Sequence, residues 1–124
     1  MTHYIGTDII EIARIKQALD RWGERFLSRI YTEPELNLYS RSPQALAARF
    51  ASKEAVMKLL GTGAKGVGWR DIETIAYPSG KPLLKLYGRA RKEANNLGIK
   101  EIDVSLAHSR EYATATAIGT AQPD

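Results

Sequence analysis

The chain has 124 residues, of which 44% are hydrophobic and 26% are charged, and these proportions indicate one globular domain over residues 1–124 and exclude a disordered chain. The absence of cysteine excludes a disulfide framework, a cysteine-ligated zinc or iron–sulfur centre and a thiol nucleophile. The formal net charge of +4 permits an acidic partner without requiring one.

The first elements are a short strand and a helix. Alternation over Tyr4–Ile9 predicts the strand. From Glu11 the apolar residues recur at helical spacing, which predicts the buried stripe of a helix. This stripe consists of Ile12, Ile15, Leu19 and Trp22. Gly23 ends or weakens the helix.

Two further helices have recognisable starts. Thr32 and Glu35 fit a capping box, with Thr32 at the N-cap and Glu35 three residues later. Ser42-Pro43 begins the longest helix, because a proline in the first turn lacks only an N–H that has no helical partner there. The helix ends at Gly61, a residue type that commonly follows a helix C-terminus.

The second half of the chain alternates strands and turns around one more helix at 88–98. Strands are predicted over residues 71–77, 83–87, 102–106 and 112–118. Adjacent strands joined by tight turns pair antiparallel, so the expected fold class is α+β, with an antiparallel sheet packed with a long helix.

Three residues are candidates for chemistry at phosphate groups. Glu54 and Lys58 lie four residues apart and share a helix face, which is also the pattern of a surface ion pair. Asp8 lies among apolar residues, where a carboxylate is costly unless something pairs with it, although it could also cap the next helix. Asp8 and Glu54 together would suit Mg²⁺, which binds one or two carboxylates, waters and phosphate oxygens.

Two other segments have weaker signals. The loop from Gly61 to Gly68 holds four glycines and a lysine, but it follows a helix C-terminus and lacks the GK[ST] of a P-loop. It is either a connector or, at Gly63, Gly66 and Gly68, a place where the backbone approaches a ligand closely. His108 lies in a predicted turn, where it is either surface or a ligand contact.

A row of basic residues runs along the first helix, on the face opposite its apolar residues. At about 100° per residue, Arg14, Arg21 and Arg25 share one stripe if the helix continues through Gly23. The stripe is either a solvated face or a docking surface for an acidic partner.

The last strand suggests association. Ala113, Ala115 and Ala117 share one face, and the other face is also uncharged, so we expect both faces to be covered. Apolar runs far shorter than about 20 residues exclude a membrane span. Without a signal-peptide pattern, we expect a cytoplasmic protein.

These motifs together resemble the short bacterial class of 4′-phosphopantetheinyl transferases, the holo-acyl-carrier-protein synthases. The resemblance covers nearly the whole chain and depends on the order of its segments. They are IGTDIIEI (5–12), TEPEL (32–36), RFASKEAVMK (49–58), GTG (61–63), GWRDIE (68–73), GKP (80–82) and SLAHSREYA (105–113).

The resemblance implies a 4′-phosphopantetheinyl transferase-like fold and a role for each candidate residue. Asp8 and Glu54 match magnesium ligands, and Glu54 and Lys58 match the catalytic pair. Coenzyme A contacts fall on Lys58, Gly63, Gly80, Lys81, Pro82 and His108. Arg14, Arg21 and Arg25 match the surface that meets acyl carrier protein. Ala107 departs from the family, in which serine or threonine often precedes the histidine.

The implied reaction is a magnesium-dependent transfer of 4′-phosphopantetheine from coenzyme A to a serine of apo acyl carrier protein, with release of 3′,5′-ADP. The resemblance also implies a homotrimer with active sites between subunits. The alternative is a non-enzymatic nucleic-acid-binding domain, suggested by the basic charge and the basic-aromatic stretch Arg21–Phe26. That alternative leaves Asp8 and Glu54 without a role.

Overall fold

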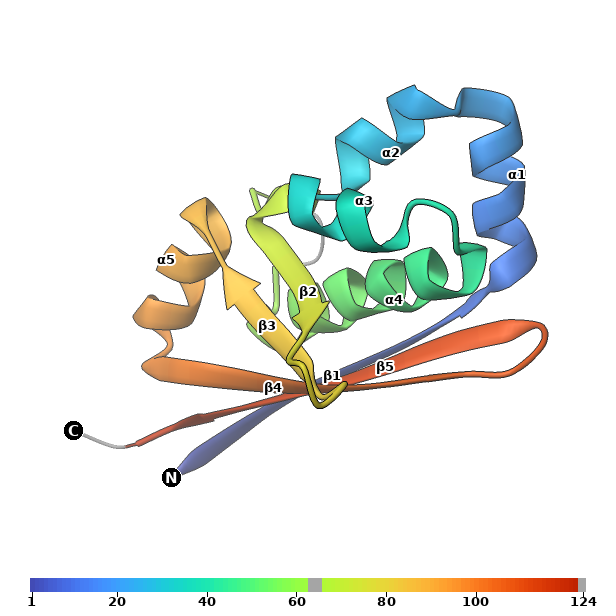
Figure 1. The fold of residues 1–124 in the computed structure, drawn as a ribbon. Helices are drawn as coiled ribbons and strands as arrows, with labels where there is room; N and C mark the ends of the chain where they lie inside the picture. Colours follow the sequence, from blue (N-terminus) through green and yellow to red (C-terminus); the bar gives the residue numbers. More distant parts are fainter. Residues whose placement is uncertain (63–65, 123–124) are drawn as a thin grey trace.

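The structure of the chain, a computed structural model, describes residues 1–62 and 66–122. Its helices and strands follow one another along the chain as Figure 1 shows. They are β1 (Thr2–Glu11), α1 (Ile12–Trp22), α2 (Glu24–Ile30), α3 (Glu33–Tyr39), α4 (Pro43–Leu60), the 3₁₀ turn η1 (Trp69–Asp71), β2 (Ile72–Ala76), β3 (Pro82–Leu86), α5 (Gly88–Asn96), β4 (Ile99–His108) and β5 (Tyr112–Ala121). This order confirms the α+β class.

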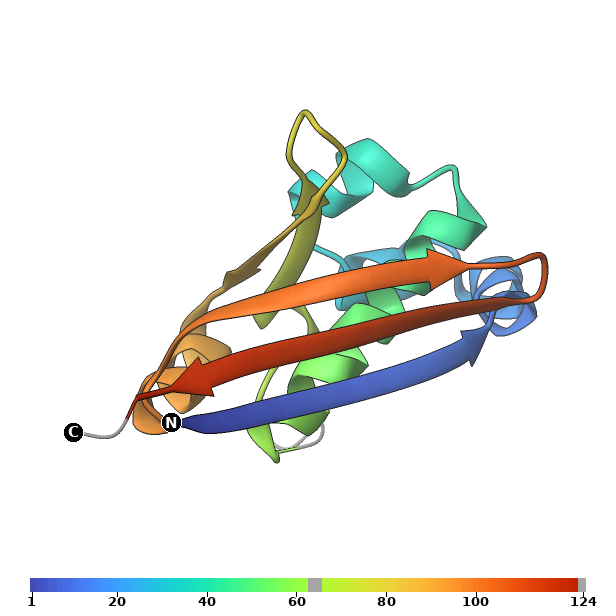
Figure 2. The ribbon, with the colours of Figure 1, turned by 90° about the horizontal axis from the view of Figure 1, so that it is seen from below.

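The main layer is an antiparallel three-stranded sheet in the order β1-β5-β4. Helix α4 lies across one face of this sheet, and the other helices and the β2–β3 hairpin lie on the same side (Figure 1). Viewed from below, the three strands form the near face, with no described element in front of them (Figure 2). The helices therefore cover one face of the sheet only.

Small residues allow α4 to approach the covered face closely. A Cβ built on Gly6 of β1 would lie 1.8 Å from the carbonyl oxygen of Ala55 on α4. Only glycine fits at this position, because any side chain would force the helix and strand apart. The inner residues of β5 facing α4 include Ala113, Ala115 and Ala117, all buried as expected.

The opposite face of the sheet is apolar and open. Ile5 and Ile9 of β1 are 67% and 62% exposed, and Ile118 of β5 is 44% exposed. The expectation that both faces of the last strand are covered therefore holds for only one face within this chain. The isoleucines point away from α4 because Gly6 and Asp8 take the alternate, inner positions of β1.

The first helix is shorter than the basic stripe requires. Gly23 adopts a φ of 52° and separates α1 from α2, so Arg25 belongs to a second helix and the premise of one continuous helix is wrong. Trp22 is 49% exposed instead of buried, because the chain changes direction directly after it. The Arg21 guanidinium lies 5.0 Å from the centre of the Trp22 ring.

The other expected elements are confirmed with small changes at their ends. The Thr32–Glu35 capping box is present, and α4 begins at Pro43 and ends before Gly61, whose φ is 77°. Strand pairing extends β4 to His108, which therefore ends a strand and does not lie in the turn. No helix within residues 1–62 and 66–122 is long and apolar enough to cross a membrane.

Candidate active site

Asp8, Glu54 and Lys58 meet where β1 passes under α4. The Lys58 ammonium donates hydrogen bonds to Asp8 Oδ1 and to the Thr7 carbonyl, both at 3.0 Å. The ion pair of Lys58 is therefore with Asp8, 50 residues away in the chain, and not a local pair with Glu54. Asp8 does not cap a helix, because Glu11 occupies the N-cap position of α1.

The charge balance of this group favours a cation. Burial raises the pKa of the Glu54 carboxyl, the negative charge of Asp8 raises it further, and Lys58 opposes both effects. Two carboxylates that repel each other across a helix–strand contact form an oxygen donor set of the kind Mg²⁺ prefers. Among the described residues there is no cluster of three or more histidine, aspartate or glutamate side chains that could hold a metal.

His108 lies in a different place, at the end of β4 beside the start of α4. It lines a cavity of about 570 Å³ together with Ser42, Gln44, Ala45, Ala48, Arg49, Leu106, Ser109 and Arg110. Arg49 and Arg110 make this cavity basic. Sequence reasoning missed Arg49, which is visible beforehand only as the first residue of the RFASKEAVMK segment.

The position of Arg49 is determined by two contacts. Its Nε donates to the Thr74 carbonyl at 3.3 Å, and its guanidinium carbon lies 3.8 Å from the centre of the Tyr39 ring. Both contacts hold the side chain between β2 and α3, at the rim of the cavity. A guanidinium held in this way suits recognition of phosphate oxygens.

One chain does not bring the acidic group and the basic cavity together. Asp8 is on β1 and His108 on β4, which are opposite edges of the sheet with β5 between them. Arg49 and Glu54 are five residues apart on α4, so their side chains leave the helix about 140° apart. The structure therefore presents two separate groups of candidate residues, one on each side of α4.

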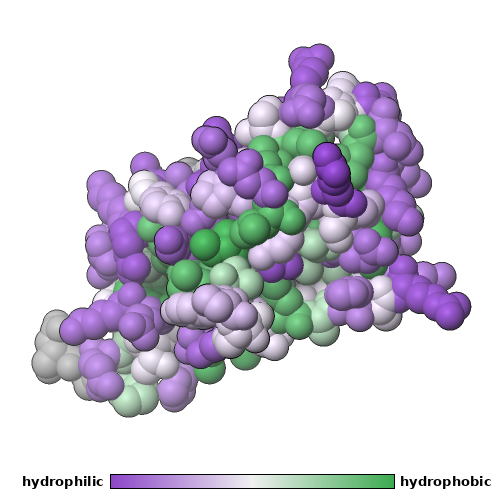
Figure 3. Space-filling view, in the orientation of Figure 1, coloured by the Kyte–Doolittle hydropathy of each residue, from purple (hydrophilic) through white to green (hydrophobic). Residues whose placement is uncertain are grey.

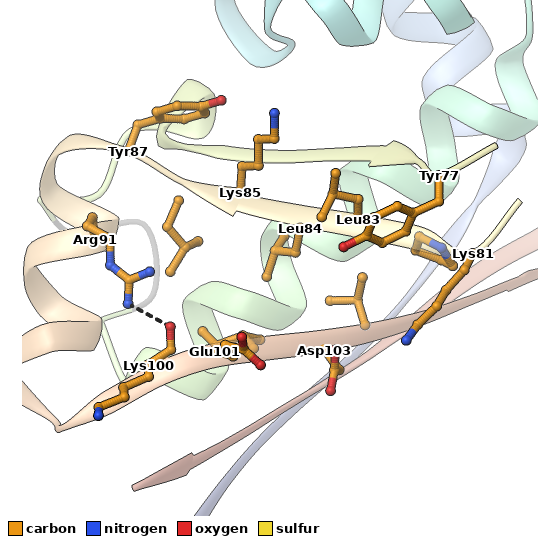
Figure 4. A pocket seen from close by; sticks show the side chains of 14 residues that line it. Tyr77, Lys81, Leu83, Leu84, Lys85, Tyr87, Arg91, Lys100, Glu101 and Asp103 are labelled. Carbon is orange, nitrogen blue, oxygen red and sulfur yellow. Dashed lines mark hydrogen bonds between the residues drawn. The ribbon is translucent and has the colours of Figure 1, made fainter. Parts of the chain in front are cut away.

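The GKP segment lies at the end of the β2–β3 turn, and its Pro82 is the first residue of β3. Gly80 has a φ of 91°, a conformation that suits glycine. Lys81 and Pro82 line one end of a groove of about 500 Å³ between β3 and β4. Figure 4 shows Lys81 and Tyr77 at one end of this groove and Tyr87 at the other. Gly63 lies outside the described residues.

Arg14, Arg21 and Arg25 are exposed at the corner formed by α1 and α2. Hydrophilic residues cover the side of the molecule formed by α1 (Figure 3). Arg25 also lines a hollow of about 510 Å³ with Trp22, Phe26, Ser28 and Arg29. This surface combines positive charge with an exposed aromatic ring.

Comparison with known proteins identifies relatives over most of the chain. Residues 4–117 match the family model described as the 4′-phosphopantetheinyl transferase superfamily. A holo-[acyl-carrier-protein] synthase of Dehalococcoides mccartyi is 54% identical over 115 residues, covering 93% of this chain and 96% of the relative. A relative of the same name from Herpetosiphon aurantiacus is 50% identical over 121 residues, covering 92% and 95%.

Solved structures agree in fold. Helicobacter pylori holo-[acyl-carrier-protein] synthase, in complex with coenzyme A, superposes with a TM-score of 0.85 at 30% identity, covering 94% of this chain and 99% of that one. The Bacillus anthracis enzyme, in complex with coenzyme A, superposes with a TM-score of 0.78 at 36% identity, covering 96% of both chains.

Proposed function

The chain belongs to the 4′-phosphopantetheinyl transferase superfamily, and we propose that it transfers 4′-phosphopantetheine from coenzyme A to a serine of apo acyl carrier protein, releasing 3′,5′-ADP. The observation that supports this activity most strongly is the Asp8–Glu54–Lys58 group, which joins two carboxylates and an ammonium beside an exposed strand edge. Nucleic-acid binding would leave this group without a role, and the names of the relatives favour the transferase.

Asp8 and Glu54 are the residues that would hold Mg²⁺. Their carboxylate oxygens fit its preference for hard oxygen ligands, and the substrate diphosphate would supply others. When bound, Mg²⁺ neutralises charge on the diphosphate and orients it for attack. Lys58, anchored by Asp8 and the Thr7 carbonyl, places a further positive charge beside the same oxygens.

The chemistry requires positioning more than a covalent group on the enzyme. The serine hydroxyl oxygen of the carrier protein attacks the phosphorus that bears the pantetheine arm. The bond from that phosphorus to the bridging oxygen breaks, and 3′,5′-ADP leaves with that oxygen. The serine proton passes to a water held by Glu54.

The basic cavity is the proposed site for the nucleotide of coenzyme A. His108, Arg49 and Arg110 offer nitrogen donors to its phosphates. The further proposed contacts are Gly80 and Lys81 in the β2–β3 turn, Pro82 at the start of β3, and Gly63.

We also propose that the complete site forms between subunits of a homotrimer, the number three being implied by the family resemblance. Two observations support association: the acidic and basic groups lie on opposite edges of one sheet, and Ile5, Ile9 and Ile118 leave an apolar sheet face open. Acyl carrier protein would dock on the exposed arginines at positions 14, 21 and 25. We propose that the enzyme acts in the cytoplasm, as a single domain and without nucleic-acid or membrane partners.

Mass spectrometry of an apo acyl carrier protein incubated with the enzyme, Mg²⁺ and coenzyme A tests the activity. The expected product is heavier by one phosphopantetheine and appears together with 3′,5′-ADP. A carrier variant in which alanine replaces the acceptor serine is the control. An unmodified carrier protein after prolonged incubation with excess enzyme would refute the proposed function.

A further inference from the structure

Small side chains are frequent where α4 packs on the sheet. Seven alanines of α4 and β5 are each at most 3% exposed. They are Ala47, Ala48, Ala51 and Ala55 on α4 and Ala113, Ala115 and Ala117 on β5. Small side chains provide few protrusions that interlock across an interface, and the larger buried side chains of α4, such as Leu46, Val56 and Met57, are apolar and make no directional hydrogen bonds.

A buried polar cluster on another side of α4 provides directional contacts. Lys53 is 0% exposed, and its ammonium donates hydrogen bonds to three acceptors. They are Glu35 Oε1 at 2.7 Å, the Trp69 carbonyl at 3.1 Å and the Ile72 carbonyl. A lysine ammonium has three donors, so all of them are used. These bonds connect α4 to α3, η1 and the start of β2.

The partner of Lys53 is itself held in place. Glu35, also 0% exposed, accepts hydrogen bonds from the backbone N–H of Thr32 and of Thr74, both at 2.9 Å. The hydroxyls of Ser52 on α4 and Thr74 on β2 lie 2.8 Å apart. The ammonium of Lys53 therefore meets a carboxylate whose position is determined by α3 and β2.

We propose that Lys53, paired with Glu35, is a positioning residue that sets the rotation of α4 and thereby places the two groups of functional side chains. This inference rests on the proposed function. Glu54 follows Lys53 directly and Arg49 lies one turn before it, so rotation of α4 moves both. Buried ion pairs contribute little net stability, but they can select one arrangement among several of similar energy.

Four variants separate positioning from stability. Lys53→Met removes the ammonium but leaves Glu35 as an unpaired buried charge, whereas Glu35→Gln/Lys53→Met removes both charges of the pair and leaves Glu73 as the remaining buried carboxylate near Lys53. Ile99→Ala is the matched control: Ile99 is 1% exposed at the start of β4, so its truncation destabilises the fold away from both groups. Ser52→Ala removes one hydrogen bond of the cluster and no charge.

The measurements are coenzyme A affinity and stoichiometry by calorimetry, and kcat and KM with carrier protein, each beside the folded fraction given by circular dichroism. For the double variant we expect kcat to fall about 10- to 100-fold, because small misplacements of reacting groups are costly. The Kd for coenzyme A should rise about fivefold, the equivalent of roughly one hydrogen bond. The KM for carrier protein should stay unchanged, because the arginine surface lies on α1 and α2.

A purely stabilising role gives a different result. It lowers the folded fraction, so kcat and the calorimetric stoichiometry fall together while the Kd for coenzyme A stays at the wild-type value, as expected for Ile99→Ala. That pattern in the double variant would overturn the proposal. Should both Lys53 variants fail to fold, Ser52→Ala is measured instead. A rise of about twofold in its Kd for coenzyme A would support positioning, and an unchanged Kd would overturn the proposal. A wild-type protein that neither binds coenzyme A nor transfers would instead refute the proposed function.

Discussion

The two edges of the three-stranded sheet carry opposite chemistry on either side of one helix. At the β1 edge, Asp8 and Glu54 concentrate negative charge, with Lys58 paired to Asp8. At the β4 edge, Arg49, His108 and Arg110 surround a basic cavity. Each edge has half of what phosphoryl transfer needs, since the carboxylates suit a metal and the basic groups suit phosphates. This contrast supports the proposal that a complete site combines the acidic edge of one chain with the basic edge of another.

Loss of the acidic edge should have the largest effect. Asp8→Asn or Glu54→Gln removes a carboxylate from the proposed metal site, and transfer should fall by about a thousandfold without loss of the fold. Addition of a chelator to the wild-type enzyme should have the same effect. Initial rates at limiting Mg²⁺ measure both changes, with the exposed Glu33→Gln on α3 as control. Near-normal turnover in both variants would exclude this site.

Dissociation of the proposed trimer, which would part the acidic edge of one chain from the basic edge of the next, should have the next largest effect. Ile9→Glu or Ile118→Glu places a charge on the open sheet face, so light scattering should show monomers and activity should fall roughly a hundredfold. Leu38→Glu on α3 is the matched control, because Leu38 is 61% exposed but lies away from the sheet. A fully active wild-type monomer at micromolar concentration would contradict the interfacial site.

Damage to the basic edge should be milder and should affect the nucleotide. His108→Ala removes one donor from the cavity, so the Kd for coenzyme A should rise about tenfold, as for one charge-assisted hydrogen bond. Calorimetry in the absence of carrier protein measures this change. An unchanged affinity in both His108→Ala and Arg49→Ala would place the nucleotide elsewhere.

Mixed trimers test whether the edges act across subunits. Asp8→Asn chains and His108→Ala chains are unfolded and refolded together in equal amounts. About one interface in four then combines an intact acidic edge with an intact basic edge. The mixture should therefore recover roughly a quarter of the activity that separates the mutant sites from the wild type. Each variant refolded alone is the control. No recovery from mixtures shown to contain both chains would indicate that each site lies within one chain.

The arginine surface belongs to neither edge and should give the smallest effect. Charge reversal of Arg14, Arg21 or Arg25 should raise the KM for carrier protein severalfold and weaken its dependence on salt, since exposed charges mainly steer association. Steady-state kinetics at two salt concentrations measure this. A fall in coenzyme A affinity instead would assign the arginines to the nucleotide site.

Local patterns were sufficient to predict several features of the molecule. Helical spacing and caps defined α4 from Pro43 to Leu60 and the capping box at Thr32. Alternation located the strands, and the motifs pointed to Asp8 and Glu54. These signals are readable because caps, turns and periodicity depend on residues a few positions apart.

Only the tertiary structure decided which residues meet across the chain. It joined Lys58 to Asp8, buried Lys53 against Glu35, added Arg49 to the His108 cavity and turned the apolar side of β1 outward. No local pattern carries this information: a lysine within a helix reads the same whether its ammonium is solvated or buried. Its environment is determined by segments distant in sequence, and the energy of a charge depends on that environment.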